Sequence, residues 1–304
     1  MESIDVGIVG LGRMGAAMAK RLAAAKVRVV AYDTVPSVVE SAGRMGLDGC
    51  ASMSLLVERL HRPRTVWCML PDGGPTESAV NTLLDLLDPD DVIVDGGNSF
   101  YKESIRRSET AAKRGVHFVD VGTSGGIRGE ENGFCLMAGG DAGVVQRLIP
   151  IFRILAPSHD RGWGHVGPTG AGHFVKMIHN GIEYGMMQAI AEGFSLLSGK
   201  ATMGLDLSQV ARIWQDGSVV RSWLLDLTAD ALSDNPRLGG IAPYIPDTGE
   251  GRWTLAEAVE LGISVPVISS ALMERFSSRD TEGFGRKLSA ALRNRFGGHD
   301  VKSE

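Results

Sequence analysis

Short apolar runs alternate with helical patterns over the first 166 residues. The apolar runs of strand length lie at residues 5–9, 27–32, 65–70, 92–95, 117–122, 133–139 and 163–166. Helical patterns separate them, as at 14–26, 76–87 and 101–114. Strands that alternate with helices in this way predict a parallel, doubly wound α/β sheet. Runs such as Val6–Val9 are apolar throughout, which is typical of strands covered on both faces.

A glycine motif follows the first predicted strand directly and opens the first predicted helix. It reads Gly10-Leu11-Gly12-Arg13-Met14-Gly15, which is G-x-G-x-x-G. Such glycines allow a tight turn, a close approach of backbone to a pyrophosphate, and close helix–strand packing, and the helix N-terminus favours phosphate charge. The context predicts a Rossmann-type dinucleotide site rather than an ordinary turn.

The residue after the second predicted strand indicates which dinucleotide binds. Asp33 lies about 20 residues beyond the motif, where an acidic side chain binds the ribose hydroxyls. A carboxylate here repels the 2′-phosphate of NADP, and the following Thr34–Ser37 contains no cation. We therefore predict that the cofactor is NAD and that NADP binds more weakly.

The pattern changes at residues 167–170, which read Gly-Pro-Thr-Gly. A long stretch without proline follows, from Ala171 to Met203. Further helical patterns lie at 206–215, 219–232, 254–261, 267–278 and 284–296. A loop rich in proline and glycine covers 235–251, and a polar tail covers 297–304. We predict an NAD-binding domain over 1–168 and an all-α substrate-binding and oligomerisation domain over 169–304.

The composition excludes several classes of protein. The 304 residues are 43% hydrophobic and 22% charged, which is typical of a soluble globular protein rather than a disordered one. A net charge of −5 argues against a nucleic-acid partner, and no apolar run reaches the ~18 residues of a membrane span. Residues 1–3 lack the basic start of a secretory signal, and the three cysteines occur singly. We expect a cytoplasmic protein without a metal site.

Three further glycine clusters follow predicted strands, at 70–74, 95–99 and 122–126. Each alone is compatible with an ordinary turn, but a doubly wound sheet places its ligands at the carboxyl ends of strands. We expect Leu70, Pro71 and Asn98 to contact the cofactor. Asn98 and Ser124, with the backbone N–H groups of Gly125 and Gly126, are suited to bind hydroxyls and a carboxylate of a substrate.

A polar stripe runs along the predicted helix that starts near Ala171. At 100° per residue, Lys176 and Glu183 lie nearly on one face, about 10 Å apart along the axis. His179, Asn180 and Tyr184 lie close to that face. The flanking residues are apolar nearly all round, which predicts a central helix whose stripe lines a cleft rather than a solvated face. These residues are Phe174, Val175, Ile178, Ile182, Met186, Met187 and Ile190.

The stripe has the groups for acid–base chemistry. A lysine acts as a base only when neutral, and both burial and a nearby positive nicotinamide ring lower a lysine pKa. A carboxylic acid one ligand-length away can deliver a proton. Lys176 and Glu183 are therefore the candidate base and acid, and we expect the chemistry to need no metal.

These motifs resemble decarboxylating 6-phosphogluconate dehydrogenase, in its short, NAD-preferring bacterial form within the β-hydroxyacid dehydrogenase superfamily. The resemblance extends from about residue 4 to 299. It rests on the motifs at 10–15, 95–99, 123–126, 176–184, 249–254 and 293–299, of which His179-Asn180-Gly181-Ile182-Glu183-Tyr184 is the most specific.

The resemblance implies oxidative decarboxylation of 6-phospho-D-gluconate to D-ribulose 5-phosphate and CO2. Lys176 would take the proton of the C3 hydroxyl, and Glu183 would protonate C1 of the enediol after CO2 leaves. Further residues would bind the phosphorylated sugar acid: Asn98, Ser124, Gly125, Gly126, His179 and Asn180 its oxygens, and Tyr184 and Arg275 its phosphate.

The resemblance also implies a homodimer or homotetramer, and the choice between them stays open. Arg293 and His299 would reach the site of a neighbouring subunit. The long family form has a phosphate-binding lysine where this chain has Thr248, and whether Arg252 replaces it is open. Gluconate or pentose phosphate metabolism would be the context.

Two other readings remain. Another β-hydroxyacid dehydrogenase, acting on 3-hydroxyisobutyrate or tartronate semialdehyde, would leave Arg275 and Arg293 without a ligand. A non-catalytic NAD-binding protein would make Lys176 and Glu183 incidental.

Overall fold

The computed structural model describes residues 5–302, apart from the side chain of Ile127. Residues 1–3, which were examined for a secretory signal, and the last two residues of the predicted polar tail lie outside this range. The chain forms two compact units, residues 1–179 and 180–304, and the long helix α8 (Ala171–Gly199) belongs to both. Each unit is described by itself.

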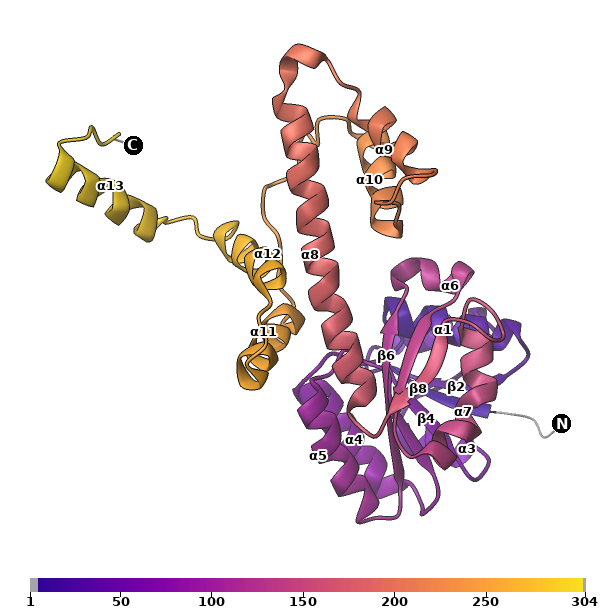
Figure 1. Ribbon diagram of the computed structural model, residues 1–304. Coiled ribbons are helices and arrows are strands. Elements are labelled where there is room, and N and C mark those ends of the chain that lie inside the picture. The colour runs from indigo at the N-terminus through magenta and orange to yellow at the C-terminus, as the bar shows by residue number, and fades with distance from the viewer. Residues whose placement is uncertain (1–4, 303–304) are drawn as a thin grey trace. The chain divides into compact units, whose positions relative to one another are not determined.

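The first unit contains a sheet of eight strands in the described range, in the order β3-β2-β1-β4-β5-β6-β7-β8 (Figure 1). The strands are β1 (Asp5–Val9), β2 (Arg28–Tyr32), β3 (Asp48–Cys50), β4 (Thr65–Cys68), β5 (Val92–Asp95), β6 (His117–Ser124), β7 (Cys135–Gly139) and β8 (Trp163–Gly167). All neighbours pair in parallel except β6 and β7. The predicted doubly wound α/β fold is confirmed.

Among the described strands, β6 and β7 form an antiparallel pair within the otherwise parallel sheet. Only a 3-10 turn η1 (Gly126–Arg128) and a single helical turn α6 (Gly129–Asn132) connect these strands. A parallel pair needs a crossover of a dozen or more residues, so this link is too short and the chain turns back.

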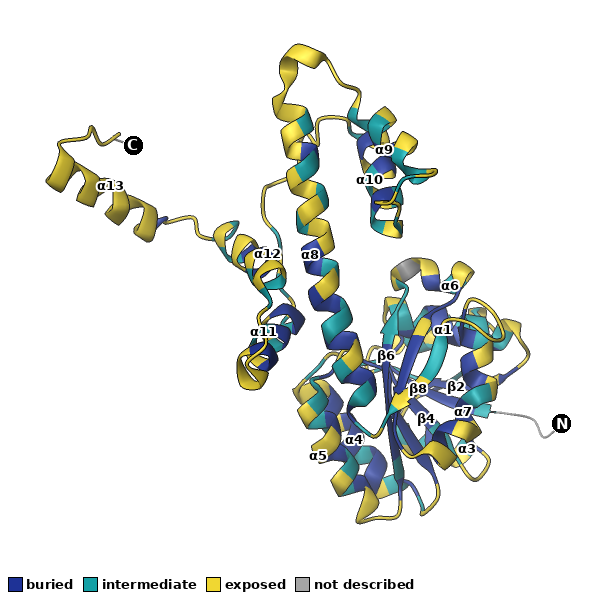
Figure 2. Cartoon of the chain, viewed as in Figure 1, coloured by how far each residue is buried: buried dark blue, intermediate teal, exposed yellow. Residues whose placement is uncertain are grey.

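Helices cover both faces of the sheet and create two cores. They are α1 (Arg13–Ala24), α2 (Pro36–Arg44), α3 (Met53–Arg59), α4 (Gly74–Leu86), α5 (Tyr101–Ala112) and α7 (Ala142–Leu155). Met18 and Leu22 of α1 pack with Phe152 of α7 in one core, whereas Leu56 of α3 and Leu83 of α4 belong to the other. Figure 2 shows the buried strands between these layers.

The sequence pattern did not predict β3, α2, α3 or α7. Strand β3 is three residues long and reads Asp-Gly-Cys, so it has no apolar run to detect. Helix α7 contains Pro150, which usually argues against a helix interior because proline removes a backbone donor.

The second unit is helical over its described residues, as predicted. Besides α8 it contains η2 (Ala201–Met203), α9 (Leu207–Gln215), α10 (Trp223–Asp234), α11 (Glu250–Leu261), α12 (Pro266–Ser277) and α13 (Phe284–Gly297). The predicted start of α10 at Val219 is wrong, because Ser222 caps the helix by accepting the Leu225 N–H at 3.2 Å. The predicted start of α11 at Thr254 is also wrong, since the helix begins at Glu250.

Helix α8 is less buried than its apolar pattern predicts. Ile182 is 52% exposed, and Met186 and Met187 are also exposed. The expectation of a central helix is therefore wrong for the single chain. An apolar pattern shows that a face needs covering, but the elements that cover it need not belong to the same chain. Over residues 5–302, no helix has both the length and the apolarity to cross a membrane.

Candidate active site

The glycine motif forms the turn between β1 and α1. Gly10 has φ +94°, and a Cβ there would lie 2.5 Å from the Met69 carbonyl oxygen. A Cβ at Gly15 would overlap the Gly10 carbonyl oxygen. Gly12 differs, because a Cβ there would meet no atom within 4 Å, so its backbone at the N-cap of α1 is open to a ligand. The turn fits a dinucleotide pyrophosphate, whose oxygens accept hydrogen bonds from backbone N–H groups at a helix N-terminus.

The remaining motif residues surround this turn. Leu11 is buried, Met14 is half-buried, and Arg13 is exposed at the start of α1. The motif thus presents backbone and one cation outward while its apolar side chains pack inward.

Asp33 holds the glycine turn in place. Its Oδ2 accepts the Leu11 N–H at 2.8 Å, and its Oδ1 accepts the Val35 N–H at 2.9 Å. The side chain is half-buried just after β2, so the carboxylate that the sequence predicts to select the cofactor also orders the glycine turn.

The loops after β4 and β5 lie against each other. A Cβ at Gly97 would lie 2.5 Å from the Leu70 carbonyl oxygen, and a Cβ at Gly10 would lie 2.9 Å from Leu70 Cδ2. Asn98 and Pro71 are exposed, and Leu70 is half-buried. The structure therefore brings the predicted cofactor contacts together beside the glycine turn.

A buried aspartate organises the loop that carries Asn98. Asp95 is fully buried, and it accepts the Gly97 N–H at 3.2 Å and the Ser99 hydroxyl at 2.8 Å. Arg107, also buried, lies 3.6 Å from Asp95 Oδ2 and balances its charge.

Lys176 lies over strand β6. A Cβ at Gly122 would overlap Lys176 Cβ, so the first turns of α8 lie directly on this strand. Lys176 is 8% exposed, and its Nζ is 3.4 Å from His179 Nδ1. His179 Nε2 is in turn 3.5 Å from Ser124 Oγ. The structure thus brings together three predicted site residues.

The turn after Ser124 has the open backbone that the sequence predicts. Gly125 and Gly126 both have positive φ, at +127° and +53°. A Cβ at Gly126 would meet no atom within 4 Å. Glycine alone adopts such angles readily, so this turn can present N–H groups to a carboxylate.

The polar stripe continues along α8 into the second unit. Asn180 and Tyr184 are buried there, and Glu183 is half-buried. Lys176 and Glu183 lie two turns apart on one continuous helix, which corresponds to about 10 Å at 1.5 Å per residue.

The predicted phosphate ligands meet in the second unit. The Arg275 guanidinium lies 3.5 Å from the centroid of the Tyr184 ring, and its Nη1 donates to the Pro246 carbonyl oxygen at 2.8 Å. The Tyr184 hydroxyl is 3.5 Å from Thr248 Oγ1, which donates to Glu250 Oε2 at 2.5 Å. Glu250 is buried and was not predicted.

Arg252 pairs with Asp247 and not with the Tyr184 and Arg275 cluster. Its Nε donates to Asp247 Oδ2 at 2.5 Å, and Arg279 lies 3.6 Å from the same oxygen. Burial acts to raise the pKa of Asp247, but the Arg252 hydrogen bond and the Gly249 N–H hold this pKa below its ordinary value. Arg252, Arg279, Phe276 and Asp280 line a cavity of about 400 Å³.

Arg293 and His299 are exposed, Arg293 on α13 and His299 just after it. Every residue of α13 is exposed. The His299 carbonyl oxygen accepts the Asn294 side-chain N–H at 2.9 Å.

Sequence reasoning missed Asp120. This fully buried side chain on β6 accepts the Gly170 and His173 N–H groups at 2.6 and 2.8 Å. Burial raises its pKa, against the lowering effect of His173 and these hydrogen bonds. The available signal was an aspartate within an apolar strand, because a buried carboxylate needs partners. Over residues 5–302, no group of three or more His, Cys, Asp or Glu side chains is placed to hold a metal ion.

Comparison with known families agrees with this geometry. Residues 5–164 match the NAD binding domain of 6-phosphogluconate dehydrogenase, and residues 172–295 match the C-terminal domain of 6-phosphogluconate dehydrogenase. The chain belongs to the 6-phosphogluconate dehydrogenase family. The resemblance seen in the sequence motifs is therefore confirmed.

Members of the family with two different lengths match this chain. The NAD(+)-dependent, decarboxylating 6-phosphogluconate dehydrogenase of Haloferax volcanii is 42% identical over 299 residues, which cover 98% of each chain. The decarboxylating 6-phosphogluconate dehydrogenase of Bacillus licheniformis is 34% identical, and the match covers 90% of this chain but 61% of that one.

A solved structure of the family has the same fold. The Plasmodium falciparum 6-phosphogluconate dehydrogenase, studied with NADP+ and with 6-phosphogluconate, superposes with a TM-score of 0.83 at 26% identity. The match covers 99% of this chain and 66% of the Plasmodium chain.

Proposed function

We propose that this protein oxidises and decarboxylates 6-phospho-D-gluconate to D-ribulose 5-phosphate and CO2, with NAD as the cofactor. The observation that carries the proposal is the placement of Lys176, His179 and Ser124 at the carboxyl end of β6, in the same unit as the glycine turn. A family relative of matching length, the Haloferax volcanii enzyme, is named as NAD(+)-dependent and decarboxylating.

Lys176 is the proposed general base. Bound NAD supplies the hydride acceptor for C3 of the substrate. Lys176 Nζ takes the proton of the C3 hydroxyl while the C3 hydride leaves, so that C3 becomes a carbonyl. The C1–C2 bond then breaks and CO2 departs. The electron pair of that bond is delocalised onto the C3 carbonyl, which gives the enediol.

Glu183 is the proposed general acid. It lies two turns beyond Lys176 on α8, and the long side chains of the base and the acid have the reach to act on the adjacent carbons C3 and C2 of one substrate. Glu183 gives its proton to the carbon that has lost CO2, and this completes ribulose 5-phosphate. His179 and Ser124 are placed to orient the sugar-acid oxygens beside Lys176.

The phosphate site is proposed to contain Arg275 and Tyr184. Arg275 is 92% buried, and its stacking on Tyr184 fixes the plane of the guanidinium, which suits a planar grip on phosphate oxygens. Thr248 supplies a hydroxyl beside Tyr184. Arg252 does not replace the family lysine in this proposal, because Asp247 already takes its Nε.

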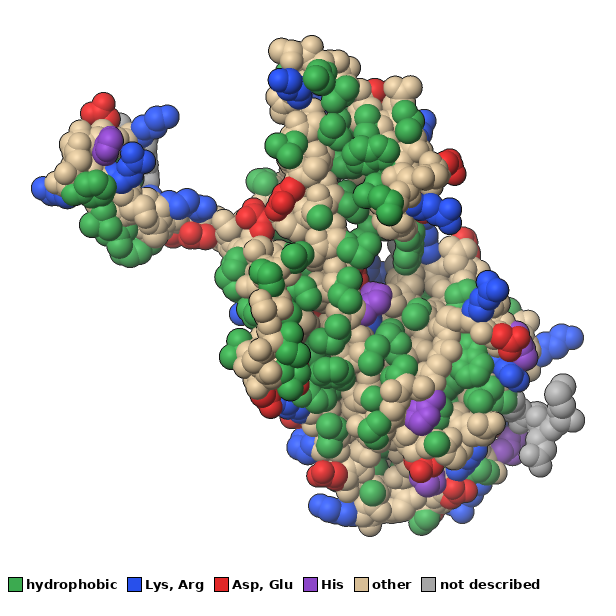
Figure 3. Space-filling model, viewed as in Figure 1, with side chains coloured by type: hydrophobic (Ala, Val, Ile, Leu, Met, Phe, Trp, Pro, Cys, Tyr) green, Lys and Arg blue, Asp and Glu red, His purple; other side chains and the backbone are tan. Residues whose placement is uncertain are grey.

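A second copy of the chain is proposed to complete the site. Helix α13 exposes Phe284, Leu288, Leu292 and Phe296, which recur every four residues and form one apolar face (Figure 3). The exposed Ile182, Met186 and Met187 of α8 also need covering. Docking of α13 on a partner would deliver Arg293 and His299 to the partner's phosphate site.

The test is a product balance with purified protein, NAD and 6-phosphogluconate. NADH is followed by absorbance while CO2 is trapped and counted. Equal amounts of NADH and CO2 would support the proposal. NADH without CO2 would indicate a simple β-hydroxyacid dehydrogenase and would exclude Glu183 as the acid of a decarboxylation. Neither product, with NADP also failing, would favour a non-catalytic binding protein.

A further inference from the structure

The first turn of α8 lies directly on the backbone of the sheet. A Cβ at Gly139 would lie 2.6 Å from the Gly172 nitrogen, and a Cβ at Gly172 would lie 2.5 Å from the Asp120 carbonyl oxygen. A Cβ at Gly122 would overlap Lys176 Cβ. Glycines at these three places let helix and strands approach as closely as backbones can, so the position of Lys176 depends on how this turn is held.

Asp120 holds this turn from the strand side. Its two carboxylate oxygens each accept one N–H, from Gly170 at 2.6 Å and from His173 at 2.8 Å. The first N–H groups of a helix have no partner within the helix, and a capping oxygen satisfies them. Most caps come from a neighbouring residue, but this one comes from β6, fifty residues earlier in the chain.

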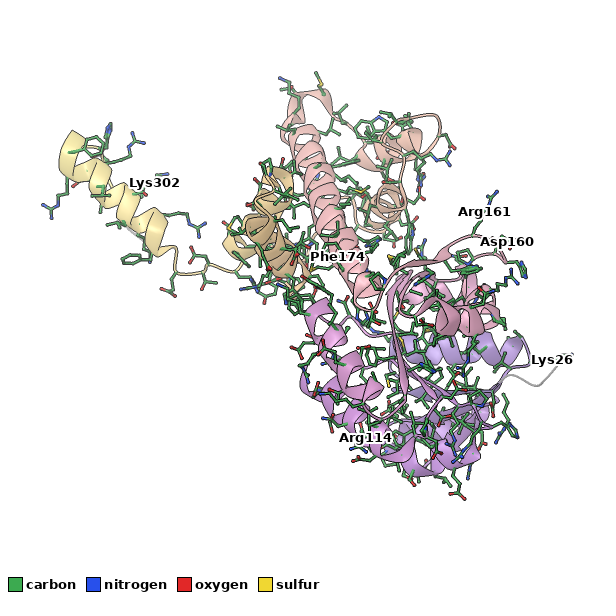
Figure 4. All side chains as sticks on the ribbon, turned by 60° about the horizontal axis from the view of Figure 1, so that its bottom comes forward. Lys26, Arg114, Asp160, Arg161, Phe174 and Lys302 are labelled. Atoms are coloured by element: carbon green, nitrogen blue, oxygen red, sulfur yellow. The ribbon has the colours of Figure 1, made fainter. Side chains whose placement is uncertain are left out.

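Helix α5 holds the same turn from a second side. Ser104 Oγ is 2.7 Å from His173 Nδ1, and both side chains are buried. Phe174, labelled in Figure 4, packs edge-on against Tyr101 with ring centroids 5.2 Å apart. The turn that ends three residues before Lys176 is thus tied to both β6 and α5.

We propose that Asp120 is a positioning residue for the reaction and acts by holding the first turn of α8 so that Lys176 lies over β6. This inference rests on the proposed role of Lys176 as the base. A displacement of about 1 Å at a reacting group can cost on the order of 100-fold in rate. Asp120 therefore affects the rate although it touches neither cofactor nor substrate.

The test compares Asp120→Ala with a matched control. Asp141 caps α7 in the same way, by accepting the Gly143 and Val144 N–H groups at 2.9 and 3.1 Å, and α7 carries no site residue. We expect Asp120→Ala to lower kcat by about 100-fold. We expect Asp141→Ala to keep kcat while it lowers the melting temperature. The dissociation constant of NAD should stay unchanged in both variants.

Two readouts separate positioning from simple instability. The pH at half-maximal kcat/KM on the acidic side, which reports the base in the free enzyme, should move in Asp120→Ala and not in Asp141→Ala. Asp120→Asn, which keeps one acceptor oxygen, should recover part of kcat. Equal kcat and equal pH profiles in the two alanine variants would overturn the inference.

Should Asp120→Ala fail to fold, Gly122→Ala tests the same point with the cap intact. Its new Cβ displaces Lys176, so we expect kcat to fall while NAD still binds. An unchanged kcat in Gly122→Ala would contradict the claim that contact with β6 positions Lys176.

A double variant distinguishes this inference from the proposed function. Asp120→Ala added to Lys176→Met should cause no further loss of kcat, because Asp120 acts on the rate only by positioning Lys176. If Lys176→Met alone retains turnover, the proposed base role fails, whatever Asp120 does. If Lys176→Met is inactive and Asp120→Ala is fully active, only the positioning role fails.

Discussion

The Asp33 carboxylate binds the backbone of Leu11, with 2.8 Å between Oδ2 and the Leu11 nitrogen. The residue predicted to select the cofactor therefore also orders the glycine turn. We predict that Asp33→Ala lowers kcat/KM about tenfold or more for NAD and for NADP alike, because it leaves the Leu11 N–H without its partner at a cost of about 1–3 kcal/mol. Steady-state kinetics with both cofactors measures this.

Thr34→Arg is the matched control for cofactor choice. It adds a cation at the exposed position directly after Asp33 and leaves the Asp33 hydrogen bonds in place. NADP use should rise in this variant relative to NAD. A preference for NADP in Asp33→Ala would show that the carboxylate acts only by repulsion.

Lys176→Met should remove nearly all turnover while NAD binding persists. The base is lost, whereas the glycine turn and Asp33 are untouched. Lys200→Met is the control, since Lys200 follows α8 and is exposed. Turnover within about tenfold of wild type, a loss of only 1.4 kcal/mol, would refute the base assignment.

Arg275→Ala should raise the KM for 6-phosphogluconate strongly, because it removes a buried cation from the proposed phosphate site. Arg252→Ala should leave this KM near the wild-type value, because Arg252 binds Asp247 instead. The reverse result would assign the phosphate to the cavity lined by Arg252 and Arg279.

Truncation before Arg293 should raise the substrate KM and leave NAD binding intact. Within the full chain, Arg293→Ala should have the same effect, and Arg295→Ala, two residues further along α13, should not. Mixing the Arg293→Ala and Lys176→Met chains should restore activity only if the tail acts on a partner's site. An unchanged KM in the truncated protein would refute a shared site.

The raised pKa of Asp120 also predicts how the free energy of unfolding depends on pH. Burial raises its folded-state pKa above the unfolded value of about 3.9, so the native state holds the proton more tightly. The contribution of Asp120 to stability is then fully present below about pH 3.9 and declines as pH rises through the folded pKa. Unfolding of wild type and Asp120→Asn across this window should show wild type losing stability relative to the variant as pH rises. A difference that stays constant with pH would contradict the shift.

Local patterns predicted much of the fold and part of the site. The apolar runs predicted the sheet, since a strand buried on both faces must be apolar throughout. The motif at 10–15 predicted its own turn, because its glycines are required by sterics between near neighbours. The spacing of Lys176 and Glu183 predicted one helix face, because the period of a helix is a local property.

Contacts between distant residues escaped prediction. No pattern near Arg252 shows that Asp247 takes its charge, and no pattern near Ala171 shows that Asp120 caps its helix. The direction of β7 depended on the length of a link rather than on the strand itself. The exposure of Ile182, Met186 and Met187 on α8 escaped prediction, because it depends on which other elements of the same chain pack against that helix.

The sequence by itself determined the strand and helix pattern, the glycine turn, the family and the set of candidate site residues. These follow from periodicity, from steric limits on glycine turns, and from residue types at fixed spacing. Only the tertiary structure decided how those side chains are held: Asp33 on Leu11, Arg275 on Tyr184, and Asp120 on the first turn of α8. The physical reason is that a buried polar group takes its partner from whatever the fold brings within about 3 Å, and that partner can lie anywhere in the chain.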